Sequence, residues 1–540
     1  MTDFNTLAQL YDNSTTEFSA NFHSKVADGR DAFTYEEFKK KCETLSDKMS
    51  GFGIGRSDKV AILSQNMPQW TMAFFSATAF GRVAVPILPD SSANEVSNIL
   101  AHSGAKALFV SKRLLVNVRQ EDIDRLVLVF DIETLEEIKS DMSACGDKSA
   151  DIARPSEEDL AAIIYTSGTT GNAKGVMLSH KNLCSSVKAC WNACHRGPKD
   201  RWLSILPMAH TLEMTIGMLY PMAVGASVYY ISKPPVPSML LKAMRTVRPT
   251  TMLSVPLIIE KVYHNSVLPM IRRSRLLSWL DRHANRLLCL VVGMKLKKTF
   301  GGRLTFFGIG GAKLDGEVEA FLLKSGFPYA VGYGLTETSP LLTYSIKGSR
   351  KVGSIGTPVL NVELKLRNVN PLTGEGEIIA KGPNVMMGYY RDPERTRAAF
   401  TDDGWFKTND LASLDASGRF FIKGRLSNMI LGASGENIYP EEIEQVINSI
   451  DGVNESIIVS RNGKLVALVN FNEDAIDWNH EGEEEFFRKL ENAKAAVLSY
   501  VNVNVNRTSR VSCVQVFKEP FDKTATKKIR RFKYADATGY

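Results

Sequence analysis

The most constraining feature of the sequence is a glycine-rich stretch, residues 165–175, that directly follows a short apolar run at residues 161–164. An apolar run of this kind is typical of a buried strand. Glycine lets the backbone turn tightly and approach a ligand closely. Successive N–H groups in such a turn form a concave anion site. The pattern therefore predicts a buried strand that leads into an anion-binding turn.

The polar side chains of this stretch are suited to a phosphate. Ser167, Thr169 and Thr170 can add hydroxyl donors, and Lys174 adds a positive charge. The spacing differs from that of the Walker P-loop, in which Ser or Thr follows the lysine, because Gly175 follows it here. A solvated surface loop is the alternative, since loops rich in Gly, Ser and Thr are usually that. On these residues alone, phosphate binding and a surface loop stay equally open.

Length and composition indicate a multidomain α/β protein. A chain of 540 residues is too long for one hydrophobic core, so we expect at least two domains. With 44% hydrophobic and 23% charged residues, it is not a disordered chain. In residues 1–150, short β-rich runs (59–63, 83–88 and 107–110) alternate with helical patterns. This alternation predicts parallel strands covered by helices.

Charge and cysteine content narrow the class of protein further. The net charge of +7 is modest for this length and does not argue for nucleic acid as a partner. The seven cysteines are scattered, which fits a reducing compartment. Cys190, Cys194 and His195 can share a helix face, but ordinary helix residues are favoured over a metal site. Residues 1–22 lack the pattern of a secretory signal, so we expect a cytoplasmic protein.

Two further apolar runs lead into glycine-rich turns. Residues 304–307 are predicted to form a strand before Gly308-Ile-Gly-Gly-Ala312, and residues 329–331 form another before 332–338. In α/β sheets, ligands bind at such carboxyl ends of strands. In the second turn Tyr333 can stack on a purine, Thr336 can bind a phosphate and Glu337 can hold Mg²⁺, although each assignment is weak in isolation.

Residues 165–175 match the phosphate-loop signature of the adenylate-forming superfamily, which includes acyl-CoA synthetases, and residues 333–338 match its second signature. The resemblance covers about residues 34–534. It implies a large N-terminal domain of helix-covered mixed β-sheets over 1–424, which binds ATP and the acyl group. It also implies a smaller, mobile α+β domain over 425–540.

The resemblance also implies a set of site residues. Glu337 and Thr166 would hold Mg²⁺, and His210 would lie between the carboxyl-substrate pocket and the nucleotide. The residues expected at ATP are Thr166, Ser167, Gly168, Thr169, Thr170, Gly171, Lys174, Gly310, Gly311, Ala312, Tyr333, Gly334, Thr336, Asp410 and Arg425. Ser434 and Gly435 are expected to face the pantetheine arm of CoA.

Alignment of residues 520–531 on the family's C-terminal motif makes Lys528 the adenylation lysine, with Lys523 and Lys527 as alternatives. Lys527 takes the place of a usual glycine. Asn409 also replaces a usual glycine, and an asparagine that tolerates the left-handed conformation can serve there. Ser427 replaces the usual Asp or Lys of the hinge, where tolerance of dihedral change matters more than charge.

The activity that follows from the resemblance is that of an acyl-CoA synthetase. Residues 207–213, Pro-Met-Ala-His-Thr-Leu-Glu, are most similar to the long-chain fatty acyl-CoA branch. ATP, Mg²⁺ and CoA are then required, and the products are acyl-CoA, AMP and pyrophosphate. The alternatives are an acyl-AMP ligase that loads a carrier protein and a non-catalytic adenylate-binding regulator.

Residues 267–303 are unusually basic, with a single acidic residue, Asp281, among them. A basic amphipathic helix with a tryptophan can lie on an anionic membrane, such as the inner face of a cell membrane. A solvated helix hairpin whose apolar stripe covers the core is slightly favoured.

Overall fold

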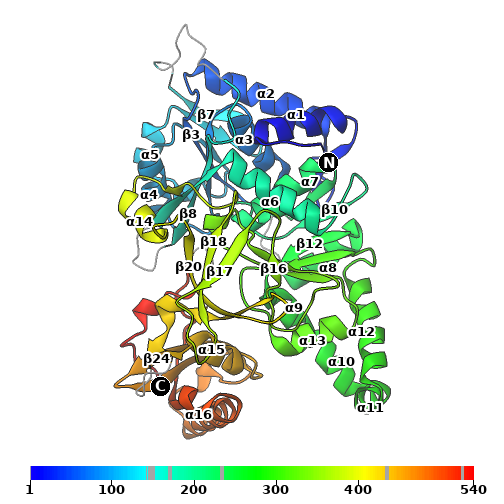
Figure 1. The fold of residues 1–540 in the computed structure, drawn as a ribbon, viewed down its shortest axis with the longest axis vertical. Coiled ribbons are helices and arrows are strands. Elements are labelled where there is room, and N and C mark those ends of the chain that lie inside the picture. Colours follow the sequence, from blue (N-terminus) through cyan, green and yellow to red (C-terminus); the bar gives the residue numbers. More distant parts are fainter. Residues whose placement is uncertain are drawn as a thin grey trace.

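The computed structural model describes residues 2–141, 143, 153–167, 173–231, 236–431, 437–524 and 528–540. Two large mixed sheets with helices on their faces make up most of the chain, and a smaller α+β unit is formed by the C-terminal residues (Figure 1). This is the predicted fold class.

The first large sheet carries the glycine-rich hairpin. Its central strands are parallel, whereas β7, β9 and β19 are antiparallel to their neighbours. The strand order is β19 (Gly388–Tyr389), β9 (Ala173–Ser179), β8 (Leu160–Ser167), β4 (Val83–Ile87), β3 (Lys59–Leu63), β5 (Ala107–Val110), β6 (Leu128–Asp131) and β7 (Glu136–Ser140). Helices α4 (Ala93–Ser103) and α5 (Gln120–Arg125) cover its outer face, with η1 (Leu115–Asn117) beside them.

The second large sheet is parallel from β14 to β1 and antiparallel at both edges. Its order is β16 (Thr357–Pro358), β15 (Thr343–Ser345), β14 (Tyr329–Tyr333), β13 (Phe306–Ile309), β12 (Thr251–Ser254), β10 (Arg201–Ser204), β11 (Ser227–Tyr230), β1 (Phe22–Val26) and β2 (Phe33–Thr34). The predicted strand 304–307 is therefore two residues too early. Gly308 and Ile309 belong to it because they pair with both neighbouring strands.

A helical layer between the two sheets shares one core with both. The helices of this layer are α1 (Leu7–Glu17), α2 (Tyr35–Gly51), α3 (Pro68–Thr78), α6 (His180–Ala193), the π-helix η3 (Glu213–Leu219) and α7 (Tyr220–Ala223). On the other face of the second sheet lie α8 (Pro237–Val247), α9 (Pro256–Val262), the π-helix η4 (Tyr263–Val267), α12 (Asn285–Thr299) and α13 (Gly316–Lys324).

Residues 267–303 form α10 (Leu268–Arg273), α11 (Arg275–His283) and α12, three helices instead of the expected hairpin. The extra break occurs at Ser274, whose hydroxyl accepts the Leu277 N–H and so starts a new helix. These helices project at the lower right of Figure 1, apart from the C-terminal unit.

A third, antiparallel sheet leads into the C-terminal unit. It consists of β17 (Glu363–Arg367), β18 (Gly376–Lys381), β20 (Phe406–Leu414) and β21 (Phe420–Arg425), and α14 (Pro393–Ala399) lies between β18 and β20 in the chain. The short helix η5 (Thr336–Thr338) lies between β14 and β15 of the second sheet. The C-terminal unit has its own apolar core. Its elements are η6 (Leu426–Asn428), β22 (Ile430–Leu431), β23 (Asn437–Ile438), α15 (Pro440–Asn448), β24 (Val453–Arg461), β25 (Lys464–Phe471), η7 (Trp478–His480), α16 (Glu484–Asn504), η8 (Arg507–Ser509), β26 (Val511–Val516) and η9 (Arg531–Lys533). The expected boundary at 424/425 stays a prediction.

Candidate active site

A cavity of about 3120 Å³ lies where the sheets and the C-terminal unit meet. Strands β8, β12, β13 and β14 direct their carboxyl ends toward it, which is where sheets of this class bind ligands. Among the residues expected from the sequence, those that line it are Thr166, Lys174, His210, Gly310, Gly311, Ala312, Tyr333, Gly334, Thr336, Glu337, Asp410, Arg425 and Lys528.

The two ends of the glycine-rich stretch belong to the paired strands β8 and β9. Thr166 and Lys174 are direct cross-strand partners, so both side chains point to the same face of this pair of strands. Ser167 ends β8. Gly168, Thr169, Thr170 and Gly171 lie outside the described residues, so their expected phosphate contacts stay predictions.

Glu337 and Lys174 lie close together at this hairpin. The Lys174 Nζ is 3.8 Å from the Glu337 carboxylate, and the Tyr389 hydroxyl donates to the same carboxylate at 2.9 Å. The Lys174 ammonium also lies 4.8 Å from the centre of the Tyr389 ring. Tyr389 therefore connects the two charged residues, a role that the sequence analysis missed because nothing in its local pattern signals a contact 52 residues away.

Asp410 is held by two partners at the opposite wall. Its carboxylate accepts a 2.8 Å hydrogen bond from Arg425 Nε and another of 2.8 Å from the Tyr333 hydroxyl. Burial raises the pKa of Asp410, and the Arg425 guanidinium counteracts part of that rise. A buried carboxylate presented in this way can accept hydrogen bonds from a ligand's hydroxyl groups.

Asn409 explains how Asp410 is presented without the usual glycine. Its φ of 63° lies in the left-handed region, as expected. Asn409 lies inside β20, where the pairing with β18 shifts register, and it directly precedes Asp410. Asparagine therefore satisfies the backbone requirement at this position.

Glycines form another part of the cavity wall. A Cβ at Gly334 would lie 1.8 Å from the Pro340 carbonyl oxygen, so only glycine fits there. Gly311, with φ of 87°, turns the chain after β13 and lines the cavity. Thr336, at the start of η5, accepts a 3.3 Å hydrogen bond from Thr211 and so brings the His210 loop against the second signature.

His210 is a neutral histidine. Burial, with a smaller effect from the Lys528 charge, lowers the pKa of His210 to about 4. Its Nδ1 accepts the Leu212 N–H at 3.3 Å, which leaves Nε2 as the proton-bearing nitrogen. At neutral pH, His210 can therefore donate one hydrogen bond without adding charge.

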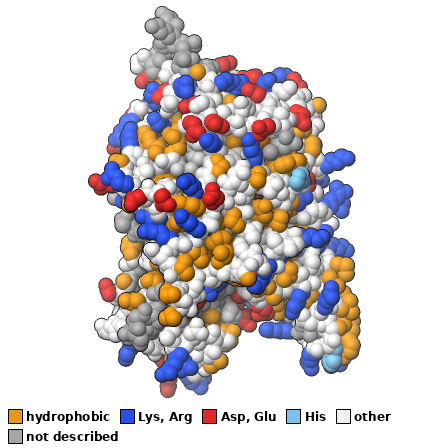
Figure 2. Space-filling view, viewed as in Figure 1, with side chains coloured by type: hydrophobic (Ala, Val, Ile, Leu, Met, Phe, Trp, Pro, Cys, Tyr) orange, Lys and Arg blue, Asp and Glu red, His pale blue; other side chains and the backbone are white. Residues whose placement is uncertain are grey.

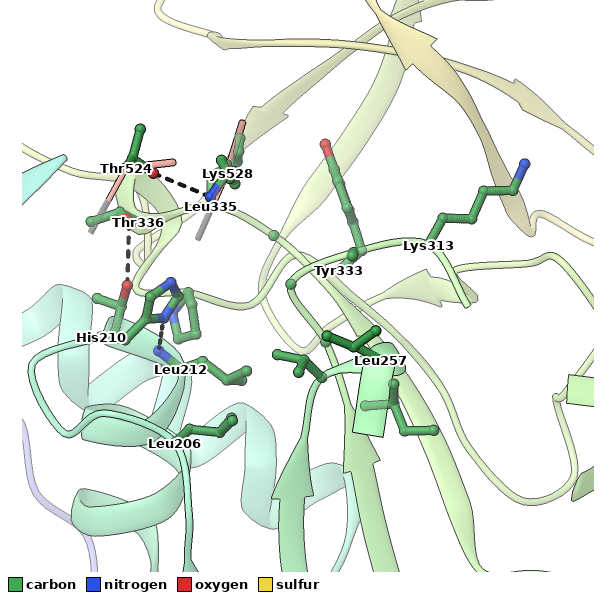
Figure 3. A pocket seen from close by; sticks show the side chains of 18 of the residues that line it. Leu206, His210, Leu212, Leu257, Lys313, Tyr333, Leu335, Thr336, Thr524 and Lys528 are labelled. Carbon is green, nitrogen blue, oxygen red and sulfur yellow. Dashed lines mark hydrogen bonds between the residues drawn. The ribbon is translucent and has the colours of Figure 1, made fainter. Parts of the chain in front are cut away.

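Lys528 comes from the C-terminal unit and faces the large sheets. Two hydrogen bonds connect it to Thr524: the Thr524 N–H donates to the Lys528 carbonyl at 2.8 Å, and the Lys528 N–H donates to the Thr524 hydroxyl at 3.2 Å. Figure 3 shows Thr524 and Lys528 on the same side of the cavity as Thr336 and His210. Desolvation by the surrounding protein and the Arg425 charge lower the pKa of Lys528, while Asp410 and Glu337 act in the opposite direction.

An ion pair and a hydrogen bond connect the C-terminal unit to the rest of the molecule in this orientation. Arg530 Nη2 is 3.2 Å from the Glu95 carboxylate of α4, and the Tyr439 hydroxyl donates to Glu375 at 2.8 Å. Residues 1–150 contain no pattern that indicates a functional site, so the contact of Glu95 was not predicted. No local signal could have revealed it, because the two charges are 435 positions apart.

The remaining expectations have mixed outcomes. Ser434, Gly435 and Lys527 lie outside the described residues. Ser427 lies in η6 and is exposed, with its hydroxyl 3.4 Å from Asn428. In the described part of the chain no cluster of His, Cys, Asp and Glu suited to a metal is found. Helix α6 ends at Ala193, so Cys194 and His195 lie beyond it and do not share a helix face with Cys190. The described helices include none long and apolar enough to cross a membrane.

The residues at the hairpin fit a Mg²⁺ ion that is also bound by phosphates. The Thr166 hydroxyl is buried and finds no hydrogen-bond partner among the described residues. The Glu337 carboxylate lies on the same cavity. Mg²⁺ is typically bound by one or two protein oxygens together with substrate phosphates, so an orphaned hydroxyl and one carboxylate suit it.

Comparison with known proteins identifies the class. The AMP-binding enzyme family matches residues 16–390, and the chain therefore belongs to this family of adenylate-forming ligases. Long chain acyl-CoA synthetase 7, peroxisomal, of Arabidopsis thaliana is 28% identical over 82% of this chain and 69% of the relative. Long-chain-fatty-acid–CoA ligase FadD15 of Mycobacterium bovis is 29% identical over 79% and 75%.

A solved structure shows the same fold. O-succinylbenzoate coenzyme A synthetase (MenE) from Bacillus subtilis, in complex with ATP and magnesium ion, superposes with a TM-score of 0.76, at 20% identity, over 98% of this chain and 99% of that one. Enzymes of this family use ATP with Mg²⁺ and CoA.

Proposed function

We propose that this protein is an ATP-dependent acyl-CoA synthetase that activates a fatty acid, with a long-chain acid as the expected substrate. The observation that carries the proposal is the position of Lys528, which reaches from the C-terminal unit into the cavity that Glu337, Asp410 and Arg425 also line. A regulator that only bound an adenylate would need no such lysine.

An apolar extension of the cavity supports an acyl substrate. Trp202, Thr251 and Phe306 are neighbours on one face of the second sheet, and all three line the cavity. Ile216 of η3 and Tyr220 of α7 line it as well, and Tyr220 packs edge-on against Trp202 at 5.8 Å. A pocket between a sheet face and helices, lined mainly by apolar groups, suits an alkyl chain.

In the first half-reaction, the acid carboxylate attacks the α-phosphate of ATP and pyrophosphate leaves. Both reactants are anionic, so positioning and charge neutralisation lower the barrier. Lys528 would neutralise the reacting carboxylate and α-phosphate, and Lys174 would bind the departing phosphates. Neutral His210 would donate a hydrogen bond beside the carboxylate, and Asp410 would accept the ribose hydroxyls.

Magnesium, bound by Thr166 and Glu337, would supply charge neutralisation at the phosphates. Tyr333 and the glycine wall around Gly310, Gly311, Ala312 and Gly334 would hold the adenine.

Lys523 is a weaker choice than Lys528 for the adenylation lysine, because its ammonium pairs with Glu455 at 2.5 Å. Arg425 would contact the ribose or a phosphate of the nucleotide.

In the second half-reaction, CoA attacks the acyl-adenylate to give acyl-CoA and AMP. We propose that residues 425–540 rotate as a domain on 1–424, which removes Lys528 and brings the Ser434-Gly435 loop to the pantetheine. An acyl-AMP ligase that loads a carrier protein is the alternative; it would exchange pyrophosphate but would not respond to CoA.

The decisive experiment is an AMP-release assay that depends on ATP and CoA, run over straight-chain acids from two to twenty carbons together with aryl and bile acids. We expect the highest kcat/KM for a long-chain acid. A preference for an aryl acid would disprove the fatty-acid assignment but retain the ligase. Pyrophosphate exchange without any CoA-dependent AMP release would favour the carrier-loading alternative, and no exchange with any acid would disprove the enzyme.

A further inference from the structure

The three helices over residues 267–303, here called the basic lobe, concentrate the charge of the protein. This segment contains nine basic residues and one acidic residue, a net charge of +8, whereas the whole chain has +7. The rest of the molecule is therefore close to neutral. The basic residues are Arg272, Arg273, Arg275, Arg282, Arg286, Lys295, Lys297, Lys298 and Arg303.

Most of these basic side chains face solvent. Eight of the nine side chains are exposed and Lys297 is half-buried. None of the nine forms an ion pair with a carboxylate whose side chain the structure describes. An uncompensated cluster of this size produces a strong local positive potential.

Large apolar side chains are exposed between these charges. On α11, Leu276 is 67% and Trp279 is 55% exposed; on α12, Met294 is 66% exposed. Leu287, Leu290 and Val291 extend the exposed stripe along α12 at helical spacing. Figure 2 shows hydrophobic side chains along the outer edge of the lower-right projection, flanked by Lys and Arg.

The exposed stripe is additional to the face that packs on the protein. Leu288, Val292 and Leu296 of α12 are buried in the core behind the second sheet. Helix α12 is thus apolar on two faces, and only one of them is covered. A helix that is apolar on most of its circumference is normally buried on both sides, which indicates that something else covers the outer stripe.

We propose that the basic lobe docks on an anionic lipid bilayer, with the stripe of Leu276, Trp279 and Met294 lying in the interface and the flanking Arg and Lys at the headgroups. Charge complementarity selects this occupant. A second copy of the chain would bring two surfaces of +8 together, which repel each other. Phosphates of a nucleic acid would pair with the cations but would leave the apolar stripe in water.

The lobe also adjoins the mouth of the cavity. Leu257, Lys261 and His264, from α9 and η4, line the cavity, and η4 continues directly into α10. Helix α12 contacts α10 through Lys295, whose ammonium is 3.0 Å from the Met270 sulfur. A bilayer on the lobe would therefore lie near the opening through which a membrane-dissolved acid can enter, a consequence that rests on the proposed function.

The test is co-sedimentation of the full chain with vesicles of phosphatidylcholine, with and without phosphatidylglycerol, in the absence of ATP and acid. Since each basic residue near an anionic surface strengthens binding about fivefold, loss of two positive charges alone weakens it about thirtyfold. The variant Arg275→Glu/Arg282→Glu also adds two negative charges, so it is expected to bind anionic vesicles at least about thirtyfold more weakly. The variant Leu276→Ser/Trp279→Ser/Met294→Ser is expected to lose most of the binding that persists at high salt.

The matched control is Arg507→Glu/Arg510→Glu, which reverses two exposed arginines of the C-terminal unit. We expect it to bind vesicles as the unaltered protein does. Equal binding to neutral and anionic vesicles, retention of binding by both lobe variants, or an equal loss in the control would each overturn the proposal. Because no substrate is present, these outcomes are independent of whether the protein is an acyl-CoA synthetase.

Discussion

The Tyr389 hydroxyl donates a 2.9 Å hydrogen bond to the Glu337 carboxylate, and the Tyr389 ring lies 4.8 Å from the Lys174 ammonium. Tyr389 belongs to β19, which pairs with β9, the strand that carries Lys174. The backbone N–H of Met386 donates to the Glu337 carbonyl at 2.8 Å, which fixes the same two segments. The proposed metal carboxylate is thus positioned by a strand outside both signature motifs.

We expect Tyr389→Phe to lower kcat/KM for adenylation about tenfold and to raise the Mg²⁺ concentration needed for half-maximal rate. The reason is that a hydrogen bond to a charged group contributes about 1.5–3 kcal/mol and here orients Glu337. Pyrophosphate exchange over a Mg²⁺ titration measures both effects. Tyr500→Phe, at an exposed position of α16, is the control. An unchanged Mg²⁺ requirement would show that Tyr389 does not position Glu337.

We expect Lys528→Ala to slow acyl-adenylate formation by about a hundredfold or more, as loss of one preorganised charge donor at a transition state does. Thioester formation from supplied acyl-adenylate and CoA should be nearly unaffected, because Lys528 would have left the site by then. Separate assays of the two half-reactions provide the measurement. Lys523→Ala is the matched control. If both half-reactions fall equally in Lys528→Ala, or if Lys523→Ala has the larger effect, the assignment is wrong.

The Arg530–Glu95 pair spans the two parts of the molecule in the arrangement that brings Lys528 to the cavity. We expect Arg530→Ala and Glu95→Ala each to slow adenylation about two- to fivefold, since such partly exposed pairs contribute at most about 1 kcal/mol. The thioester half-reaction should be retained. A double-mutant cycle checks the contact: the double variant should be no slower than either single variant, and additive losses would contradict it.

We expect the free energy of unfolding to decrease at acidic pH because of His180. This side chain is fully buried, and its Nδ1 accepts the Leu7 N–H at 3.1 Å. Burial lowers the pKa of His180 from 6.5 to about 4. Between pH 6.5 and about 4, the unfolded chain therefore binds a proton at His180 that the folded protein does not bind. The free energy of unfolding decreases as the pH falls through this range. Below about pH 4, the stability that neutral His180 provides is lost entirely.

The shift in pKa corresponds to about 3 kcal/mol at most. His180→Gln should lower stability at pH 7 but flatten its decline between pH 6.5 and 4, as monitored by urea unfolding at several pH values. His283→Gln, at an exposed position of α11, should leave the slope unchanged. An identical slope in His180→Gln would refute this explanation.

Much of the site follows from the chain itself, because its motifs are local. A strand, glycines and polar side chains within about ten residues mark the segments that carry Thr166, Lys174 and Glu337. Thr166 lies near the carboxyl end of β8, Lys174 at the start of β9 and Glu337 in η5, shortly after β14. The tolerance of Asn409 for a positive φ is likewise a property of the residue, and the structure shows φ of 63° there. The shift of β13 to Phe306–Ile309 was not predictable, since pairing with two neighbouring strands decided it.

The sequence by itself determined the α/β class, the family and the segments that carry the charged and glycine-rich groups. Only the tertiary structure decided that Tyr389 meets Glu337, that Glu95 meets Arg530, and that one apolar face of α12 is covered while the other is not. These relationships depend on how distant segments pack, and a side chain's partner or exposure is set by neighbours that are remote in the chain. Helical periodicity can show that Leu287 and Met294 share a face, but the packing of α10, α11 and α12 on the second sheet decides that this face is in contact with water.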